Sequence, residues 1–494
     1  MIRRLMLTFA VLVMLIGNFS LSILSAGELY IGGATISITP DERVALDGQM
    51  YTRISEKIES PCMATALAME TRDGEQSLDQ AIFVSCDLVF FGGGKSTFFG
   101  EEPTFYKEFR QAMNGHLPAP LISKIILNAT HTHTAPVTEE GLYQLPESGV
   151  MHPAEYRQFL IRQLVDVIMQ AWEKRTPAQV SWGLGHAVVA QNRRSVYANG
   201  TAAMYGKTDQ PSFRGIEGYE DHGVELLYFW NAKNQLIATA INVACPSQVV
   251  ESRSTINADY WHQVRERLRE KHGKELLVLT WCGAAGDQSP RPMYRRDAET
   301  RMEQLRGVDH LDEIARRITD TWEDVYQVVR NDRHSDIPFE HQVKTIELPS
   351  IKLTALQANA SRAAAAKVTD PKFQWRKFWF EGVAQRYEKQ QAGELLTYKM
   401  ELHAIRLGDV AIVTNDFELY TDYGVRMKAR SPALQTFVIQ LCGGGTYLPT
   451  ERAVSGGGYS AIPESNRVGP EGGQVLVEES VKLIETLWPV TKKQ

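Results

Sequence analysis

Two histidines placed two residues apart are the feature of this sequence best suited to chemistry. His131 and His133 follow the apolar run 122–127 and lie in the stretch Asn128-Ala129-Thr130-His131-Thr132-His133-Thr134-Ala135-Pro136. On an extended backbone, alternate side chains point to the same side, so both imidazoles face one site. This spacing suits shared binding of one metal ion, or one metal ligand beside one acid–base group. The alternative is a polar loop with two incidental histidines.

Four other apolar runs also end in residues that can do chemistry. They lead into Cys245-Pro246-Ser247-Gln248, Gly286-Asp287-Gln288-Ser289-Pro290, Asn415-Asp416-Phe417-Glu418 and Gly443-Gly444-Gly445-Thr446-Tyr447. In open α/β sheets, ligands bind beyond the carboxyl ends of the strands. Five strand ends of this kind predict one site that is assembled from distant parts of the chain.

Glu418 and Cys245 are the residues that would join the histidines in a zinc site. Zinc accepts imidazole, thiolate and carboxylate ligands, and a catalytic zinc site keeps one position open for water. A glutamate after a strand is otherwise a solvated loop residue, and a cysteine there is otherwise a small buried hydrophobe. The sequence contains no His-Glu-x-x-His motif, which excludes a zincin.

Ser289 has two readings. In Gly286-Asp287-Gln288-Ser289-Pro290 it is either a nucleophile or oxyanion donor, or part of an ordinary turn, since glycine, aspartate, serine and proline all favour turns. The motif lacks the Gly-x-Ser-x-Gly pattern of a nucleophile elbow, which disfavours an α/β-hydrolase triad. Arg193 and Arg194 are likewise either a buried pair or a solvated one.

The N-terminal segment indicates an exported protein. Residues 1–26 have the pattern of an export signal, with Arg3 and Arg4 before an apolar core at 5–16 and the small residues Ser25-Ala26 at its end. No later run is long enough to span a membrane. The mature chain 27–494 is therefore expected to be soluble, secreted or periplasmic, and to fold as one catalytic domain. A net charge of −6 without a basic block argues against nucleic acid as a partner.

Apolar β-branched runs that alternate with helical patterns predict an α/β protein with a mixed, largely buried sheet flanked by helices. Strands are expected at 81–85, 122–127, 236–244, 276–281, 410–414 and 436–441, and helices at 154–174, 260–272, 361–367 and 374–391. Asp259 has the position of an N-cap for the second helix, and Gly273 would end it. The five cysteines show no regular spacing, so they do not predict a disulfide scaffold, and an odd count leaves at least one thiol unpaired or metal-bound. Cys245 is the candidate.

These motifs resemble those of the neutral/alkaline, non-lysosomal ceramidases, a family of zinc-dependent amidases. The stretch Thr130-His131-Thr132-His133-Thr134-Ala135-Pro136 is similar to the family's His-Thr-His-Ser-Gly-Pro, and Gly286-Asp287-Gln288-Ser289-Pro290 to its Gly-Asp-Val-Ser-Pro. Asn192-Arg193-Arg194 resembles its Asn-Arg-Ser, Glu418 matches its Pro-Gly-Glu segment in spacing, and Tyr447 and Tyr459 match its two tyrosines. The resemblance runs through most of the mature chain.

By this resemblance His131, Glu418 and Tyr447 are expected to bind zinc. His133, Arg193 and Tyr459 are expected around the scissile carbonyl, and Ser289 corresponds to the family's essential serine. Cys245 lies where the family has its second zinc histidine, which makes a thiolate the fourth ligand. The sequence also lacks a segment that matches the family's C-terminal immunoglobulin-like domain.

The resulting hypothesis is an exported, zinc-dependent hydrolase of an amide or ester bond. In it, zinc-bound water or Ser289 attacks the carbonyl of a small-molecule, lipid or acylated substrate, with ceramide and acylated sugars both open. Two alternatives stay open: a non-catalytic binding protein on the same fold, and a carbohydrate deacylase or esterase. The sequence does not determine the oligomeric state.

Overall fold

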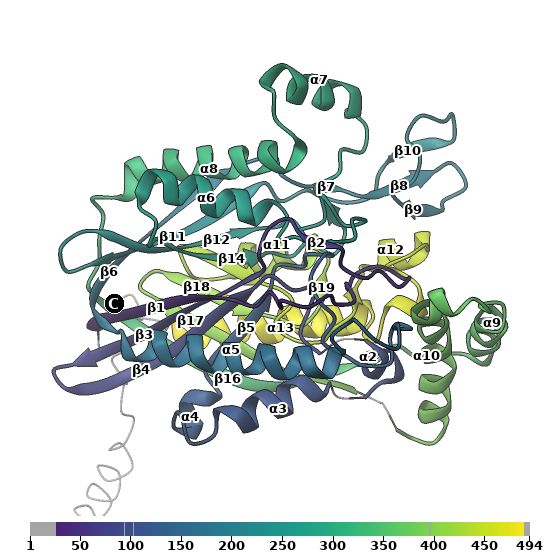
Figure 1. Ribbon diagram of the computed structural model, residues 1–494, viewed down its shortest axis with the longest axis horizontal. Coiled ribbons are helices and arrows are strands. Elements are labelled where there is room, and N and C mark those ends of the chain that lie inside the picture. Colours follow the sequence, from purple (N-terminus) through teal and green to yellow (C-terminus); the bar gives the residue numbers. More distant parts are fainter. Residues whose placement is uncertain (1–25, 93, 102, 395–396, 489–494) are drawn as a thin grey trace, which may run out of the picture.

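A computed structural model describes residues 26–488 of the 494, except 93, 102 and 395–396. The expected export signal lies almost wholly outside these residues. The described part is a mixed α/β structure built on a 12-stranded sheet (Figure 1), in which the path β14-β12-β11-β6-β1-β16-β17-β18-β20 carries a branch from β1 through β3 and β4 to β5. This confirms the predicted fold class.

The strands, in chain order, have the following bounds: β1 Ala26–Ser37, β2 Lys57–Ile58, β3 Met63–Asp73, β4 Gln76–Cys86, β5 Ile125–Ala129, β6 Thr176–His186, β7 Gln191–Asn192, β8 Arg194–Tyr197, β9 Ala202–Met204, β10 Phe213–Ile216, β11 Gly223–Asn231, β12 Leu236–Val243, β13 Thr255–Ile256, β14 Leu277–Cys282, β15 Gln288–Ser289, β16 Asp336–Pro349, β17 Thr397–Leu407, β18 Val410–Thr414, β19 Glu418–Leu419, β20 Gln435–Ile439 and β21 Tyr447–Leu448.

The helices have the following bounds: α2 Lys95–Phe99, α3 Thr104–Met113, α4 Ala119–Ile122, α5 Pro153–Glu173, α6 Tyr260–His272, α7 Arg296–Arg306, α8 His310–Val329, α9 Ala355–Ala365, α10 Gln374–Gln391, α11 Thr421–Arg430, α12 Glu451–Gly456 and α13 Pro470–Leu487, with short 3-10 turns at Pro371–Phe373 and Pro463–Ser465. No helix in the described part of the chain is long and apolar enough to cross a membrane.

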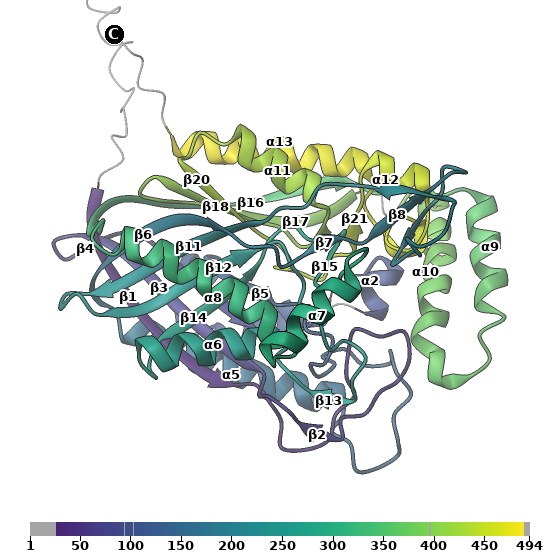
Figure 2. The same cartoon turned by 90° about the horizontal axis from the view of Figure 1, so that it is seen from above.

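The sheet curves around a central apolar core. That core contains residues from strands of every part of the sheet, among them Ile31, Phe83, Phe229, Trp281 and Ile412. Helices α3, α4 and α5 cover the outer face of β1, β3, β4 and β5, helices α6 and α8 cover β6, β11, β12 and β14, and helices α11 and α13 cover β16, β17, β18 and β20. Figure 2 shows α11 and α13 on one side of the strands and α5 and α6 on the other.

Helix boundaries follow from local chemistry. Asp259 is the N-cap of α6, where its side chain accepts a hydrogen bond from the backbone N–H of Tyr260, and Gly273 follows the last residue with φ of 111°. Both were predicted, because aspartate satisfies a free N–H at a helix start and glycine tolerates positive φ at its end. Helix α5 buries Leu160, Leu164 and Ile168 at helical spacing against β1 and β3.

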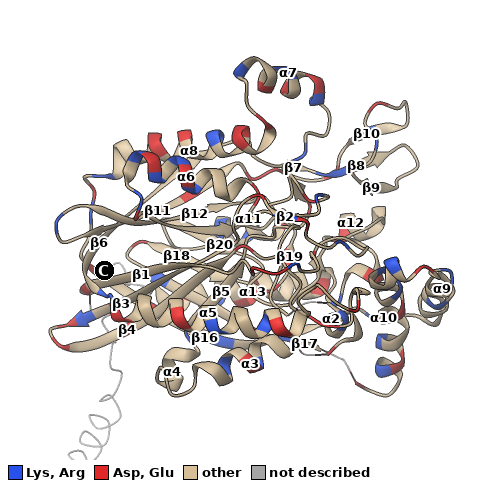
Figure 3. Ribbon diagram, viewed as in Figure 1, with Lys and Arg blue, Asp and Glu red and all other residues tan. Residues whose placement is uncertain are grey.

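One predicted strand is wrong in its first part. Residues 122–127 form the last residue of α4 and the start of β5, with a short turn at 123–124 between them. Pro120 lies in the first turn of this short helix, where its fixed φ is tolerated, and apolar periodicity does not detect so short a helix. Charged residues of both signs occur together along the helices and loops, whereas the central strands carry few (Figure 3).

Candidate functional site

The two histidines lie at the carboxyl end of β5, which pairs in parallel with β4. His131 has a φ of 65°, so the backbone is left-handed there and not extended as the sequence analysis assumed. This conformation is uncommon for a residue with a side chain and occurs often at functional sites. The imidazoles still meet, because the Nε2 atoms of His131 and His133 are 3.3 Å apart, with the rings at 75°.

The tautomer of His131 is set by a backbone carbonyl. Its Nδ1 lies 2.9 Å from the carbonyl oxygen of Val89, which only accepts, so Nδ1 carries the proton. In the neutral ring Nε2 then has a free lone pair. That atom faces the Oε2 of Glu418 at 3.2 Å and the His133 Nε2, and the side chain of His131 is only 3% exposed. Lone pairs and a carboxylate this close require a cation between them, either a proton or a metal ion.

Glu418 is positioned by a two-strand pairing outside the main sheet. Strands β19 and β21 pair in parallel and set Glu418 opposite Tyr447. Gly286 permits this approach, because a Cβ there would lie 2.2 Å from the Glu418 carbonyl oxygen. The hydroxyl of Tyr447 accepts a hydrogen bond from Arg193 Nη2 at 3.2 Å, and the same nitrogen is 3.9 Å from Glu418 Oε2. Burial, and then the Glu418 charge, raise the pKa of Tyr447 well above its usual value.

Gln248 connects His133 to Arg193. Its Oε1 accepts from Arg193 Nη1 at 3.0 Å, which fixes the orientation of the amide because arginine has only donors. The amide nitrogen must then donate to His133 Nε2, 2.8 Å away. The proton of the neutral His133 ring is therefore on Nδ1, which has no hydrogen-bond partner and lies 3.6 Å from Glu251 Oε2. Burial, and then the neighbouring His131 and Arg53 charges, lower the pKa of His133 well below its usual value.

The loop after β1 packs against His133 from the other side. Arg53 donates from Nη2 to the carbonyl oxygen of His133 at 2.6 Å. Gly48 has a φ of 89°, and a Cβ there would lie 2.4 Å from the Cγ of the His133 ring. Any larger residue would displace that ring, so glycine is needed at this position for both its conformation and its lack of a side chain.

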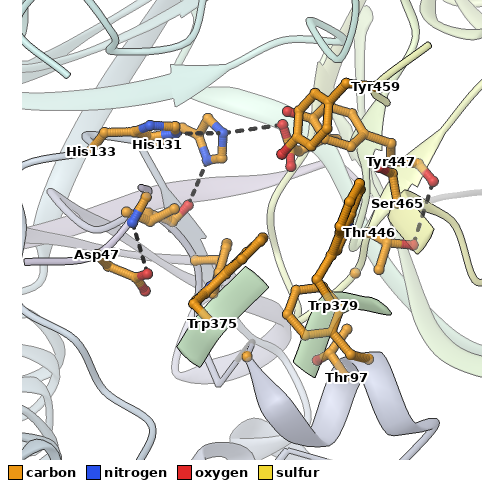
Figure 4. A pocket seen from close by; sticks show the side chains of 17 residues that line it. Asp47, Thr97, His131, His133, Trp375, Trp379, Thr446, Tyr447, Tyr459 and Ser465 are labelled. Carbon is orange, nitrogen blue, oxygen red and sulfur yellow. Dashed lines mark hydrogen bonds and ion pairs between the residues drawn. The ribbon is translucent and has the colours of Figure 1, made fainter. Parts of the chain in front are cut away.

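These groups line a narrow, largely aromatic cavity of about 60 Å³. Its walls include Asp47, Gly48, Val89, Phe90, Phe98, His131, His133, Trp375, Trp379, Glu418, Tyr447 and Tyr459. In Figure 4 the two histidines lie on one wall, the two tyrosines face them, and Trp375 and Trp379 of α10 form a further wall. The Phe98 ring of α2 packs edge-on against Trp375, with centroids 5.0 Å apart. The volume suffices for about four water-sized groups.

Six of the eight site residues named from the sequence come together here. His131, His133, Glu418, Tyr447 and Tyr459 line the cavity, and Arg193 contacts Tyr447 directly behind it. Arg193 and Arg194 are both buried, which decides between the two readings of that pair. Arg194 does not face the site, because its guanidinium binds Glu217 and backbone carbonyls.

Cys245 is not brought to this cavity. Its side chain is fully buried in the apolar cluster between α6, α8 and the sheet, and its thiol contacts the carbonyl oxygens of Val189 and Pro246, each at 3.6 Å. Burial raises the pKa of the thiol well above its usual value, which disfavours a thiolate. All five cysteines are unpaired. The placement therefore lends no support to the predicted thiolate ligand.

Ser289 also lies away from the cavity wall. Its hydroxyl accepts hydrogen bonds from the backbone N–H of Arg291 and from the Tyr205 hydroxyl, each at 3.1 Å. The first is the local contact of a serine turn, which was the alternative reading from the sequence. Tyr205 in turn accepts from Arg193 Nη1 at 3.1 Å, so Ser289 supports the site through two intervening side chains.

Three of the four zinc ligands expected from the sequence lie together at the cavity, and Cys245 does not. His131 Nε2 and Glu418 Oε2 converge with lone pairs facing each other, and the Tyr447 phenol adjoins them. Among the described residues, however, no group of three or more histidine, cysteine, aspartate and glutamate side chains is arranged to hold a metal ion. An imidazole, a carboxylate and a phenol are thus the protein groups that would hold zinc.

Comparisons with known proteins identify the type of fold. No protein-family model matches the sequence, and no curated protein is significantly similar to it. A crystal structure of neutral ceramidase from Pseudomonas aeruginosa superposes with a TM-score of 0.63 and 14% identity, over 95% of this chain and 76% of that one. A ceramidase structure complexed with C2 gives 0.63 and 13%, over 95% and 77%. The chain therefore has a ceramidase-like fold.

Several site residues were not identified from the sequence. Gln248 and Glu251 follow the same strand end as Cys245, and the signal for them was their position in that segment. Trp375 and Trp379 are four residues apart in a helix that was predicted, and this spacing places both on one face. Asp47 and Arg53 lie in a loop without a recognisable pattern, and only the fold brings them to His133.

Proposed function

We propose that this protein is a zinc-dependent hydrolase of an amide or ester bond that acts on short acyl groups. The observation that carries this proposal is the approach of His131 Nε2 to Glu418 Oε2 at 3.2 Å on the wall of the site cavity, where both side chains are largely buried. Two acceptors held at this distance in a buried place are suited to a cation. A zinc ion bound there supplies Lewis acidity and water of lowered pKa.

The chain's own residues divide the remaining work. Tyr459 lines the cavity, and burial raises its pKa, so its hydroxyl is neutral and donates a hydrogen bond to the carbonyl oxygen as negative charge develops there. Arg193 supplies a buried positive charge behind Tyr447 and fixes the position of that ring. His133 is the group that would take the proton, because burial favours its unprotonated form. For this step its Nε2 must exchange the hydrogen bond from Gln248 for one from the attacking water.

The dimensions of the cavity support a short acyl group. A volume of about 60 Å³ beside the two tryptophans accommodates an acyl group of acetyl size within the cavity itself. The longer acyl chain of a ceramide-like lipid would have to extend out of the cavity. The flat faces of Trp375 and Trp379 also suit a sugar ring, which favours a carbohydrate deacylase or esterase as the second candidate.

A panel of N-acyl and O-acyl substrates tests this proposal. It contains acetyl, butyryl and decanoyl amides of one amine and the matching esters, together with N-acetyl and O-acetyl sugars. We expect hydrolysis of the acetyl compounds that is abolished by a chelator and restored by zinc. A Glu418→Gln variant should be inactive on all of them. Absence of hydrolysis across the panel in zinc-loaded protein would favour the non-catalytic alternative, and a preference for decanoyl would contradict the assignment of chain length.

A further inference from the structure

Asp47 is a buried carboxylate on the wall of the site cavity to which the proposed reaction gives no role. The residue is only 4% exposed and lines the cavity. Arg53, whose charge acts on it, directs both terminal nitrogens of its guanidinium to backbone carbonyl oxygens and not to this carboxylate. A buried carboxylate without an ion pair is costly to the fold and is typical of a functional group.

Local hydrogen bonds orient the carboxylate of Asp47 and leave one of its oxygens without a donor. Its Oδ1 accepts from the Gly48 N–H at 2.7 Å, and the Tyr143 hydroxyl lies 3.1 Å from the same oxygen. No residue in the described part of the chain donates to Oδ2. Burial raises the pKa of Asp47, whereas these two donors and the Arg53 charge oppose that rise and favour the ionised form. An oriented acceptor is therefore available to a ligand in the cavity.

Trp375 gives this end of the cavity a flat apolar wall. It is half-buried and packs against the cluster that contains Tyr143, whose hydroxyl contacts Asp47. Trp379 is only 6% exposed, and its ring meets that of Tyr459 with centroids 5.9 Å apart. Figure 4 shows Trp375 on the side of Asp47 and Trp379 on the side of the tyrosines. The partly exposed tryptophan and the free carboxylate oxygen thus belong to the same end of the cavity.

The position of His133 indicates which part of the substrate meets this end. Gly48, the neighbour of Asp47 in the chain, lies against the His133 ring, where a Cβ would be 2.4 Å from Cγ. In the proposed reaction His133 would take a proton from the attacking water, and the same group returns it to the departing atom. The leaving group is therefore expected near His133 and beside Asp47 and Trp375, with the carbonyl oxygen toward Tyr459.

A hydroxyl matches the free oxygen of Asp47 better than an ammonium group. Arg53 donates from Nη2 to the Asp47 carbonyl oxygen, so one positive charge already lies against this segment and repels a second. Glu139 adds little opposing charge, because burial raises its pKa to about 7. A hydroxyl donates one hydrogen bond without adding a charge, and the C–H groups of a ring that carries it suit the electron-rich face of Trp375.

We propose that Asp47 and Trp375 form a subsite for a pyranose ring, and that the leaving group of the hydrolysis is a sugar. Asp47 Oδ2 accepts from a ring hydroxyl beside the scissile bond, while the face of Trp375 packs against the C–H groups of the ring. This assignment rests on the proposed hydrolysis and names its leaving group. An open-chain amino alcohol also carries hydroxyls, but it lacks the flat face that Trp375 would cover.

Turnover of matched acetyl compounds tests the subsite. N-Acetylglucosamine is compared with N-cyclohexylacetamide, whose ring has no hydroxyls, and with N-acetylserinol, an open-chain amide that has them. O-Acetylglucose, cyclohexyl acetate and glycerol monoacetate form the matching set of esters. We expect kcat/KM for the sugar to exceed that for each comparison compound by at least about tenfold, the contribution of one hydrogen bond to a charged group. Equal turnover of either comparison compound in both sets would overturn the proposal.

Two variants test the residues. In Asp47→Asn, the Gly48 N–H holds the amide oxygen at the Oδ1 position, so a donor nitrogen replaces Oδ2. The ratio of kcat/KM for the sugar to that for the cyclohexyl compound should fall at least about tenfold, and Trp375→Leu should lower it as well. Asp73→Asn, in the exposed turn between β3 and β4, is the matched control and should keep the ratio.

A general base at Asp47 would give a different result. Its loss would slow the sugar and the cyclohexyl compound equally and leave their ratio as it was. An unchanged ratio in Asp47→Asn and in Trp375→Leu, with circular dichroism showing that both variants are folded, would contradict the assignment.

Binding measurements separate this subsite from the hydrolysis itself. Calorimetric titration of Glu418→Gln, which is expected not to turn over, should show N-acetylglucosamine binding at least about tenfold more tightly than N-cyclohexylacetamide. Adding Asp47→Asn should remove the difference. Sugar binding that depends on Asp47, in a protein without turnover, would support the subsite and remove the hydrolysis. Turnover of acetyl compounds without a preference for sugars would do the reverse, and tighter binding of cyclohexylamine than of the sugar would overturn the choice of a hydroxyl.

Discussion

His131 Nε2 and Glu418 Oε2 lie 3.2 Å apart, although the two residues are 287 positions apart in the sequence (418 − 131). The Val89 carbonyl fixes the His131 tautomer, and the β19–β21 pairing fixes the backbone of Glu418. When the His131 imidazole is neutral and the Glu418 carboxylate is ionised, neither of these two atoms carries a proton. The arrangement is therefore strained unless a cation lies between the two atoms, and this relationship is the basis of the proposed zinc site.

Replacing Gln248 tests whether it positions His133. Gln248→Met keeps the size of the side chain but removes the donor to His133 and the acceptor for Arg193. Two buried polar groups then lose a partner, at a cost of about 1–3 kcal/mol each. We expect acyl hydrolysis to fall at least about tenfold, with zinc content unchanged. Gln342→Met, at a half-buried position of strand β16 outside the site, is the matched control and should keep full activity. Normal turnover in Gln248→Met would remove its positioning role.

The sequence predicted the site residues better than it predicted their surroundings. His131 and Glu418 were identified because each follows a buried strand, and strand ends of parallel neighbours meet at one edge. The left-handed backbone at His131 was not predictable, because it depends on Leu88 and Val89, which receive hydrogen bonds from Thr132 and His131. The rule that alternate residues share one side did not apply, although its conclusion about the rings was right.

Ser289→Ala distinguishes a turn residue from a catalytic one. The Ser289 hydroxyl accepts from Arg291 N–H and Tyr205 and does not line the cavity. We expect acyl hydrolysis to change by less than about threefold, as for ordinary substitutions away from a site. Steady-state rates of the two proteins with an N-acetyl substrate provide the measurement. A loss of about 100-fold or more would instead make Ser289 an oxyanion donor or nucleophile.

Cys245→Ser addresses the ligand that sequence similarity suggested. The thiol is buried among apolar side chains and points to carbonyl oxygens, so the variant should keep its zinc. Burying a more polar hydroxyl should lower the free energy of unfolding by about 1–3 kcal/mol. Zinc analysis and thermal unfolding give both quantities. Loss of zinc in Cys245→Ser, with recovery in Cys245→His, would show that the thiol is a ligand after all.

Similarity of motif did not reveal the direction of the Cys245 side chain. A residue that directly follows a strand can face either side of the sheet, and a one-residue difference in where the strand ends reverses it. Strand β12 ends at Val243, one residue earlier than the sequence analysis expected. Gln248, three residues further along, reaches the site instead.

The buried histidines should make stability depend on pH. Burial, and then the Arg110 charge, lower the pKa of His403 to about 3, so the folded state holds this ring neutral while the unfolded chain is protonated at its ordinary pKa. The resulting stabilisation is present above about pH 6.5 and is lost as pH falls toward 3, by about 1.4 kcal/mol per pH unit. Urea unfolding at pH 7, 6, 5 and 4 gives the free energy of unfolding at each pH. This free energy should fall less steeply with decreasing pH in His403→Phe than in the unmodified protein. Parallel curves would mean that His403 is not buried and neutral.

Zinc content per chain tests the central claim most directly. It is measured by mass spectrometry of the metal on protein purified without chelator, for the unmodified chain and for His131→Ala and His133→Ala. His131 is assigned as a ligand, whereas the Nε2 of His133 is engaged by Gln248. We predict about one zinc per chain in the unmodified protein and in His133→Ala, and almost none in His131→Ala. Below about 0.2 zinc per chain in the unmodified protein, or equal loss in both variants, would contradict the account.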